Sequence, residues 1–275
     1  MNSLDMLLCP FTACLMLAPV LGYLGLHVIR REVVFIDMAV AQFAAVGAVA
    51  AHLFLHVGGG SPTAMTAAWV ATVLAGIFYA VTRRYAIGFP LEAMIGISYA
   101  SAAALSLLLI GKGTGGHTHI QQMLSGKLLW VSWRDVGWSA VWFGAAGGLA
   151  FVFRRAFQKI SDDYEAALAA GMRVVLWDIL FYAVCGMVIT VAVRLAGIVV
   201  VFAFLIIPAT VAILFAERWH IRLVVAAIFG IIAAAMGLTF CQLADFSAGV
   251  SVAFWLAVLL AAAVIPRVVF FRGKA

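Results

Sequence analysis

The stretch at 196–216, AGIVVVFAFLIIPATVAILFA, carries no charged residue over a length that can cross a bilayer. About 20 apolar residues of helix are needed to cross the hydrocarbon core of a membrane. One proline, Pro208, lies inside the run. In lipid, the backbone groups that a proline leaves unbonded need partners from neighbouring helices or from water. We therefore expect a membrane-spanning helix that is broken or kinked at Pro208, either as a moving part or as a static kink in a packed bundle.

The rest of the chain is equally apolar. Of its 275 residues, 67% are hydrophobic and 10% are charged, and the mean hydropathy is +1.17, whereas charged residues approach a quarter of a soluble domain. These values predict an all-α, polytopic integral membrane protein with one transmembrane domain over 1–275. About eight or nine transmembrane helices are expected, and the candidate spans are 6–28, 33–56, 62–82, 92–111, 136–153, 174–193, 196–216, 222–240 and 249–265.

The basic residues predict the orientation of these spans. If the N-terminus lies outside, 13 of the 17 lysines and arginines fall on the inner side, as the positive-inside rule requires. We therefore expect a retained first helix and a C-terminus in the cytoplasm of a bacterial cell. The net charge of +6 arises in short clusters and not in a basic domain, so no nucleic-acid partner is expected. The predicted inner set is Arg30, Arg31, Arg83, Arg84, Arg154, Arg155, Lys159, Arg173, Arg218, Arg222, Arg267, Arg272 and Lys274.

The predicted outer side carries one long connection and most of the histidines. The connection, 111–135, begins with glycines and ends near Trp130 and Trp133, which favour a helix lying at the membrane interface. Pairs of histidines at short spacing can chelate a transition metal, although exposed polar residues are expected at such places in any case. The pairs are His52 with His56, at i and i+4 of one span, and His117 with His119 in the long connection.

The longest predicted inner connection, 154–173, contains SDDYEAALAAGMR at 161–173. Ser161 or Asp162 is expected to cap a short polar helix that ends at Gly171, with acidic residues in its first turn. A polar helix of this kind in the cytoplasm indicates either a docking site for a partner or a solvated linker.

Six segments in order carry a family resemblance: VIRREVVFIDMAVAQFAAVGAVAA at 28–51, PLEAMIGISYASAAALSLLL at 90–109, QQMLSGKLLWVSW at 121–133, SDDYEAALAAGMR at 161–173, GIVVVFAFLIIPATVAILFA at 197–216 and GLTFCQLADFSAGVSVAF at 237–254. This series, which covers nearly the whole chain, resembles the permease subunits of the ABC metal-import family. Those permeases serve zinc, manganese or iron uptake together with a separate ATPase and a separate metal-binding protein.

The resemblance implies a permease that moves a divalent metal by alternating access and binds no cofactor of its own. No GxxxxGK[ST] phosphate loop occurs in the chain, so it is not expected to be an enzyme, and ATP would be hydrolysed by the partner ATPase. The family's ATPase docks on the segment that matches 161–173, which contains Asp162, Asp163, Glu165 and Gly171. The other implied partners are an extracytoplasmic metal-binding protein, a second permease copy and membrane lipid.

One departure from the family pattern concerns the metal itself. Family members carry Asp-x-x-x-His in their second span, whereas here Asp37 is followed four residues later by Ala41. When the glycine that follows is aligned, Gln42 stands at the histidine position, and its amide oxygen is a poorer ligand for soft metals than imidazole. A charge in lipid is costly and usually functional or paired. Asp37 is therefore expected either to coordinate the cation or to pair with Arg30 or Arg31.

The remaining polar candidates in or beside the spans have both functional and structural interpretations. Asp178 is expected to pair with Arg173 near its own helix end, and Glu92 to interact with the dipole of its own helix. Asp245 resembles the family's Asp-Gly turn, where the roles of helix cap and cation funnel stay open. The resemblance places Pro208 near the translocation path.

The sequence therefore predicts an ATP-driven importer permease for zinc, manganese or iron in the cytoplasmic membrane. Loss of the family histidine makes a metal chelate or a cobalamin-like cargo the alternative within transport. A membrane scaffold or sensor that transports nothing is the alternative from another class.

Overall fold

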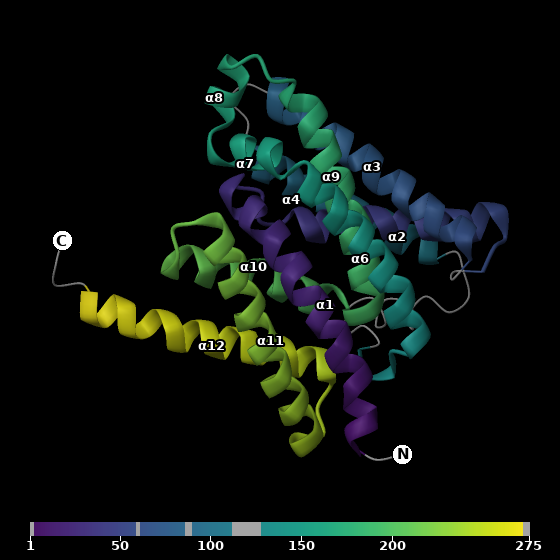
Figure 1. Cartoon of the computed structure of the whole chain (residues 1–275). Helices are drawn as coiled ribbons and strands as arrows, with labels where there is room; N and C mark the ends of the chain where they lie inside the picture. The colour runs from purple at the N-terminus through teal and green to yellow at the C-terminus, as the bar shows by residue number, and fades with distance from the viewer. Residues whose placement is uncertain (1–2, 59–60, 86–89, 112–127, 272–275) are drawn as a thin grey trace. The chain divides into compact units, whose positions relative to one another are not determined.

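The computed structural model describes residues 3–58, 61–85, 90–111 and 128–271, and these residues form helices joined by short turns (Figure 1). The outer histidines His117 and His119 and most of the connection at 111–135 lie outside the described residues. The helices are α1 (Ser3–Arg30), α2 (Ile36–Leu55), α3 (Pro62–Tyr85), α4 (Leu91–Gly111), the 3-10 turn η1 (Leu128–Trp130), α6 (Trp133–Val152), α7 (Arg154–Asp162), α8 (Tyr164–Ala169), α9 (Val174–Ala196), α10 (Ile198–Phe215), α11 (Trp219–Ala244) and α12 (Ala248–Phe271).

Each of the nine predicted spans coincides with one long helix, within a few residues at each end. In the described part of the chain, eight of these helices are by themselves long and apolar enough to cross a membrane. The ninth, α6, meets this criterion only together with α7, from which it is bent by 69°. The all-α, polytopic membrane fold predicted from composition is confirmed.

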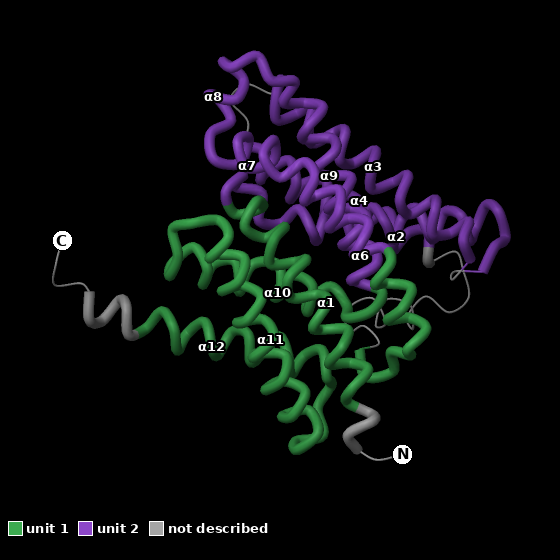
Figure 2. The backbone as a smooth tube through the Cα atoms, viewed as in Figure 1, with its two compact units in different colours: residues 1–29, 123–141, 194–275 green, residues 30–122, 142–193 purple. Residues whose placement is uncertain are grey.

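The chain divides into two compact units, which are described separately here (Figure 2). Unit 1 contains residues 1–29, 123–141 and 194–275, and therefore most of α1 together with α10, α11 and α12. Unit 2 contains residues 30–122 and 142–193, and therefore α2, α3, α4, α7, α8 and α9. The expectation of one permease domain over 1–275 stays a prediction.

Small residues let the helices of unit 2 approach closely. A Cβ added at Gly47 of α2 would lie 2.5 Å from the carbonyl oxygen of Ala67 on α3. A Cβ added at Gly76 of α3 would lie 2.9 Å from the Cβ of Tyr182 on α9. Membrane helices associate through such close backbone packing, because lipid gives no hydrophobic driving force between them. The positions of α2, α3 and α9 relative to one another are therefore fixed by contacts that only glycine allows.

In unit 1, α10 runs without interruption from Ile198 to Phe215, with Pro208 buried inside it. The helix is therefore not broken at Pro208, and the alternative expectation, a kink at this residue, stays a prediction. Because proline has no N–H, the carbonyl of Phe204, four residues earlier, lacks its usual helical donor.

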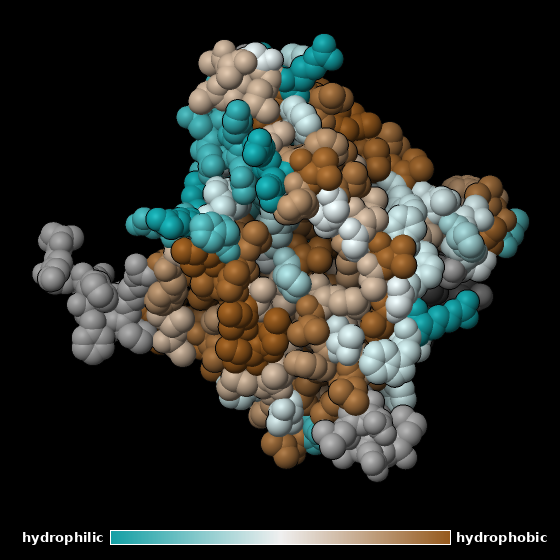
Figure 3. Space-filling view, in the orientation of Figure 1, coloured by the Kyte–Doolittle hydropathy of each residue, from teal (hydrophilic) through white to brown (hydrophobic). Residues whose placement is uncertain are grey.

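Exposed apolar stripes mark the surfaces that face lipid. In Figure 3, hydrophilic residues gather over α7 and α8, and hydrophobic residues cover α10. Large side chains recur at helical spacing along single faces of α3 and α11, as expected for helices in contact with acyl chains. They are Val70, Leu74, Ile77, Phe78 and Val81 on α3, and Ile221, Val224, Ile228 and Ile232 on α11.

Candidate functional site

Asp37 lies in the first turn of α2 and is 2% exposed. Its Oδ1 atom is buried and has no hydrogen-bond partner. Burial disfavours a negative charge on Asp37, whereas the backbone N–H groups of Asp37 and Met38 favour it. The positive end of a helix macrodipole also stabilises a negative charge at this position. The residue is therefore a buried carboxyl group with one oxygen that has no hydrogen-bond partner among the described residues.

The arginines expected as possible partners of Asp37 are engaged elsewhere. Arg30 Nη1 donates to Asp162 Oδ1 at 3.1 Å, and Arg31 Nη1 donates to Asp178 Oδ1 at 2.5 Å. Among the described residues, Asp37 has no ion pair. Of the two interpretations offered by the sequence, pairing of Asp37 with Arg30 or Arg31 is the one that the structure contradicts.

A second carboxylate comes from α4. Glu92 lies in the first turn of its own helix, as predicted, but its Oε1 accepts the backbone N–H of Phe35 at 3.1 Å. Phe35 is the N-cap residue of α2 and makes no side-chain capping bond of its own. The Oε2 atom of Glu92 is buried and has no hydrogen-bond partner among the described residues. The negative charge of Glu92 disfavours a negative charge on Asp37. The N-terminus of α2 is thus flanked by two carboxylates.

The other candidate ligands on α2 do not join this pair in the described structure. Gln42 is partly buried and, at 100° per residue, lies about 140° around the helix from Asp37. His52 is exposed and bonds through Nδ1 to the carbonyl oxygen of Val57 at 2.6 Å. His56 is the C-cap residue of α2, with φ of 52°, and a metal site formed by His52 and His56 stays a prediction. Within the described ranges, no group of three or more His, Cys, Asp or Glu side chains is placed to hold a metal ion.

Asp178 of α9 forms the centre of a buried charge cluster. Its carboxylate is 0% exposed, and it accepts hydrogen bonds from Arg31 and from Arg83, whose Nη1 lies 3.3 Å from Oδ2. The predicted pairing of Asp178 with Arg173 is therefore wrong: Arg173 is exposed at the edge of a pocket. The partners come from the turn before α2 and from the end of α3, which lie far from Asp178 in sequence.

The same arginines contact α7 and α8. Arg31 Nε donates to Ser161 Oγ at 2.9 Å, and its guanidinium lies 4.0 Å from the ring centre of Phe181. Arg83 stacks over the ring of Tyr164 at 4.2 Å. Burial raises the pKa of Tyr164, and the nearby Asp178 charge raises it further, so the ring stays a neutral phenol that suits a cation–π contact. Through these contacts, α7 and α8 are joined to the ends of α3 and α9.

The segment 161–173 folds in a slightly different way from the sequence-based expectation. The cap of α8 is Asp163, whose side chain accepts the Ala166 N–H at 2.9 Å. Ser161 and Asp162 instead belong to the end of α7, where Ser161 binds Arg31 and Asp162 binds Arg30. The predicted stop at Gly171 is confirmed by its φ of 75°, which glycine adopts readily.

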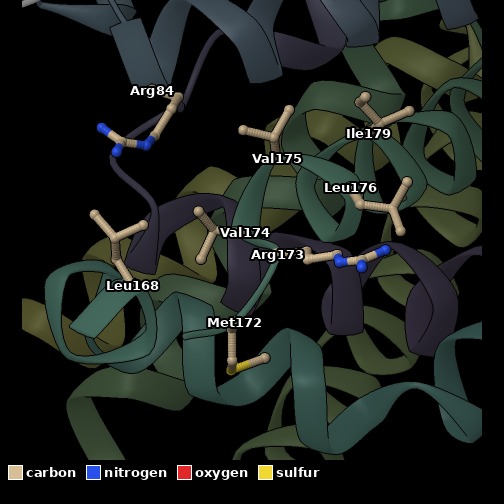
Figure 4. A pocket seen from close by; sticks show the side chains of 8 residues that line it. All are labelled: Arg84, Leu168, Met172, Arg173, Val174, Val175, Leu176 and Ile179. Atoms are coloured by element: carbon tan, nitrogen blue, oxygen red, sulfur yellow. The ribbon is translucent and has the colours of Figure 1, made fainter. Parts of the chain in front are cut away.

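A pocket of about 340 Å³ opens beside α8 and the start of α9 (Figure 4). Figure 4 shows the guanidinium groups of Arg84 and Arg173 on opposite sides of its apolar side chains. The apolar lining consists of Leu168, Met172, Val174, Val175, Leu176 and Ile179.

The two predicted path residues lie in unit 1. Pro208 is buried within α10. Asp245 is exposed and ends α11 as its C-cap, with φ of 56°. The structure therefore gives Asp245 the position of a helix cap, and the cation-funnel interpretation stays a prediction.

The same fold occurs in a solved structure. The chain superimposes on a chain of PsaBC from Streptococcus pneumoniae in complex with Fab, with a TM-score of 0.79 at 24% identity, over 95% of this chain and 92% of that one. The ABC 3 transport family model matches residues 3–267. This chain therefore belongs to the ABC 3 transport family.

Two curated relatives carry names that refer to manganese. The manganese transport system membrane protein MntC of Halalkalibacterium halodurans is 28% identical over 271 residues, which are 96% of this chain and 86% of that protein. The manganese transport system membrane protein MntD of Bacillus subtilis is 27% identical over 232 residues, or 80% of this chain and 78% of that protein.

Proposed function

We propose that this chain is the membrane-spanning permease subunit of an ATP-driven importer for a divalent metal ion. Manganese is the favoured cargo because both named relatives are manganese transport proteins, and iron and zinc are the alternatives within the same family. The observation that carries the proposal is the buried Asp37, whose free Oδ1 lies in the second span, where the family places its metal. A carboxylate oxygen is a hard ligand that suits Mn²⁺.

We propose that a partner ATPase docks on 161–173 at the cytoplasmic face. Asp162, Asp163 and Glu165 are exposed there, and Arg31 and Arg83 connect the segment to Asp178. Movement of α7 and α8 on ATP binding would reach α3 and α9 through these contacts, and alternating access needs such a connection. An extracytoplasmic metal-binding protein and a second permease copy complete the proposed assembly.

The test is manganese uptake by proteoliposomes that contain the permease with its ATPase and its metal-binding protein. Asp37→Asn keeps the shape of the side chain and removes the charge. We expect uptake to fall at least about tenfold, because losing even a partner of a metal ligand costs about 10–100-fold. ATPase binding and membrane insertion should stay unchanged.

The matched control is Glu32→Gln, which removes an exposed carboxylate from the turn before α2. Uptake should stay at the wild-type rate in this variant. Normal transport by Asp37→Asn would refute the role of Asp37, and an equal loss in both variants would mean that net charge, not the site, is responsible.

A second candidate cargo is a metal chelate, which is favoured by the loss of the family's metal-binding histidine near Asp37. The two candidates differ in one measurement. Free Mn²⁺ should compete with the cargo for uptake if the bare ion is what the permease recognises. It should have no effect on uptake of the chelate if only the chelate is recognised.

A further inference from the structure

Two carboxylate oxygens beside the start of α2 have no hydrogen-bond partner among the described residues. They are Oδ1 of Asp37 and Oε2 of Glu92, and both are buried. The other oxygen of Glu92 is held by the N–H of Phe35 at 3.1 Å. Phe35 precedes Asp37 by two residues, so this bond fixes the Glu92 carboxylate against the same helix end that carries Asp37.

In the described part of the chain, no basic side chain forms an ion pair with Asp37 or Glu92. Arg30 and Arg31, the nearest arginines in sequence, donate to Asp162, Ser161 and Asp178. Two neighbouring carboxylates repel each other and disfavour their own ionised forms, and at Asp37, which is 2% exposed, an unpaired buried charge costs several kcal/mol. A bound divalent cation would neutralise both carboxylates at once.

We infer that Glu92 of α4 supplies the second carboxylate of a divalent-cation site with Asp37, and so takes the role of the histidine that the family has near its aspartate and this chain lacks there. This inference rests on the proposed function. Carboxylate and water ligands suit Mn²⁺, whereas imidazole suits zinc, copper and iron. The exchange of histidine for glutamate therefore favours manganese over zinc. Water and the second permease copy complete the coordination sphere.

Glu92 also caps α2, and a test has to separate the two roles. Glu92→Gln keeps a carbonyl oxygen that can accept the Phe35 N–H but removes the negative charge. Glu92→Ala removes both the charge and the cap. The experiment measures Mn²⁺ binding to the assembled permease–ATPase complex in lipid nanodiscs, by the loss of the electron paramagnetic resonance signal of free Mn²⁺, together with the thermal unfolding midpoint.

We expect Glu92→Gln to weaken Mn²⁺ binding at least about tenfold and, in the presence of Mn²⁺, to lower the unfolding midpoint less than Glu92→Ala does, because it keeps the bond to Phe35. Glu92→Ala should weaken binding and also lower the midpoint. Glu92→Asp should retain part of the affinity, because it keeps the charge on a shorter side chain. Glu32→Gln, the exposed control, should bind as the wild type does. In competition, Zn²⁺ should displace Mn²⁺ poorly from the wild-type complex.

The outcomes separate this inference from the proposed function. If Asp37→Asn loses Mn²⁺ and Glu92→Gln binds it normally, the metal site stands and Glu92 is only a cap. If neither substitution changes binding, both the inference and the proposed role of Asp37 fail. If the wild-type complex binds no Mn²⁺ and the unfolding midpoint of Glu92→Gln rises, the carboxylates share a proton, and the inference is overturned.

Discussion

Substitution of Asp178 tests whether the buried charge cluster behaves as one unit. Asp178→Asn leaves the guanidinium groups of Arg31 and Arg83 without their anion. Removing one partner of a buried pair costs about 3–5 kcal/mol. Because the Arg83 side chain is 13% exposed and water reaches part of it, we expect the lower end of this range, about 3 kcal/mol. At about 2–4 °C per kcal/mol for a large domain, the unfolding midpoint should fall by about 6–12 °C.

A double-mutant cycle turns this expectation into a measurement of coupling. Once Arg83→Gln has removed one guanidinium, loss of Asp178 leaves only Arg31 unpaired. The double variant should therefore be less destabilised than the sum of the single variants, by about 0.5–3 kcal/mol. The control pairs Asp178→Asn with Arg84→Gln, because Arg84 is the exposed neighbour on α3 and has no ion pair among the described residues. Those two effects should add to within about 0.5 kcal/mol.

Additive effects for Asp178 and Arg83 would refute the reasoning, since residues of one network must couple. The cycle is measured from thermal unfolding of the purified permease, and the same variants are reconstituted with the ATPase. We expect Asp178→Asn to transport less metal for each ATP hydrolysed. A wild-type ratio of transport to hydrolysis, with a lowered midpoint, would mean that the cluster stabilises the fold and transmits nothing.

Two further substitutions address the docking segment and the proline. Replacing Glu165 and Gly171 together should uncouple ATPase stimulation from transport while the protein still inserts. The reason is that an exposed acid and the left-handed turn that ends α8 are both lost. Unchanged coupling in the folded double variant would refute the proposal that 161–173 is the docking site. Pro208→Ala restores an N–H to the interior of α10 and should lower transport more than abundance, and equal losses in an uptake assay and an immunoblot would indicate a purely structural proline.

The spans were predictable from the sequence because each is an apolar run bounded by charge or glycine. Membrane helices satisfy their backbone hydrogen bonds internally, so hydropathy alone locates them. The predicted helix at 174–193 and the observed α9, Val174–Ala196, begin at the same residue. The stop at Gly171 was equally local, because a positive φ is a property of one residue.

The charge partners were not predictable from the sequence, because they depend on which helix ends meet in three dimensions. Arg173 is five residues from Asp178, yet Arg31 and Arg83 are its partners. Glu92 was correctly placed in the first turn of α4, but its bond to Phe35 reaches another helix. The one available signal was that the predicted inner ends of the spans carry many more arginines than the spans carry acids. Burying Asp178 without a cation would be costly, and two of those arginines meet it.

The glycine contacts of unit 2 limit how a transporter of this kind can change shape. A rotation of α2 about its own axis would carry the side chain next to Gly47 into the backbone of α3 at Ala67. A sliding of α3 along α9 would meet the same obstacle at Gly76 and Tyr182. Packed interfaces of this density resist gradual deformation. We therefore expect α2, α3 and α9 to move as one rigid body during the transport cycle, with bending confined to the turns that connect the helices.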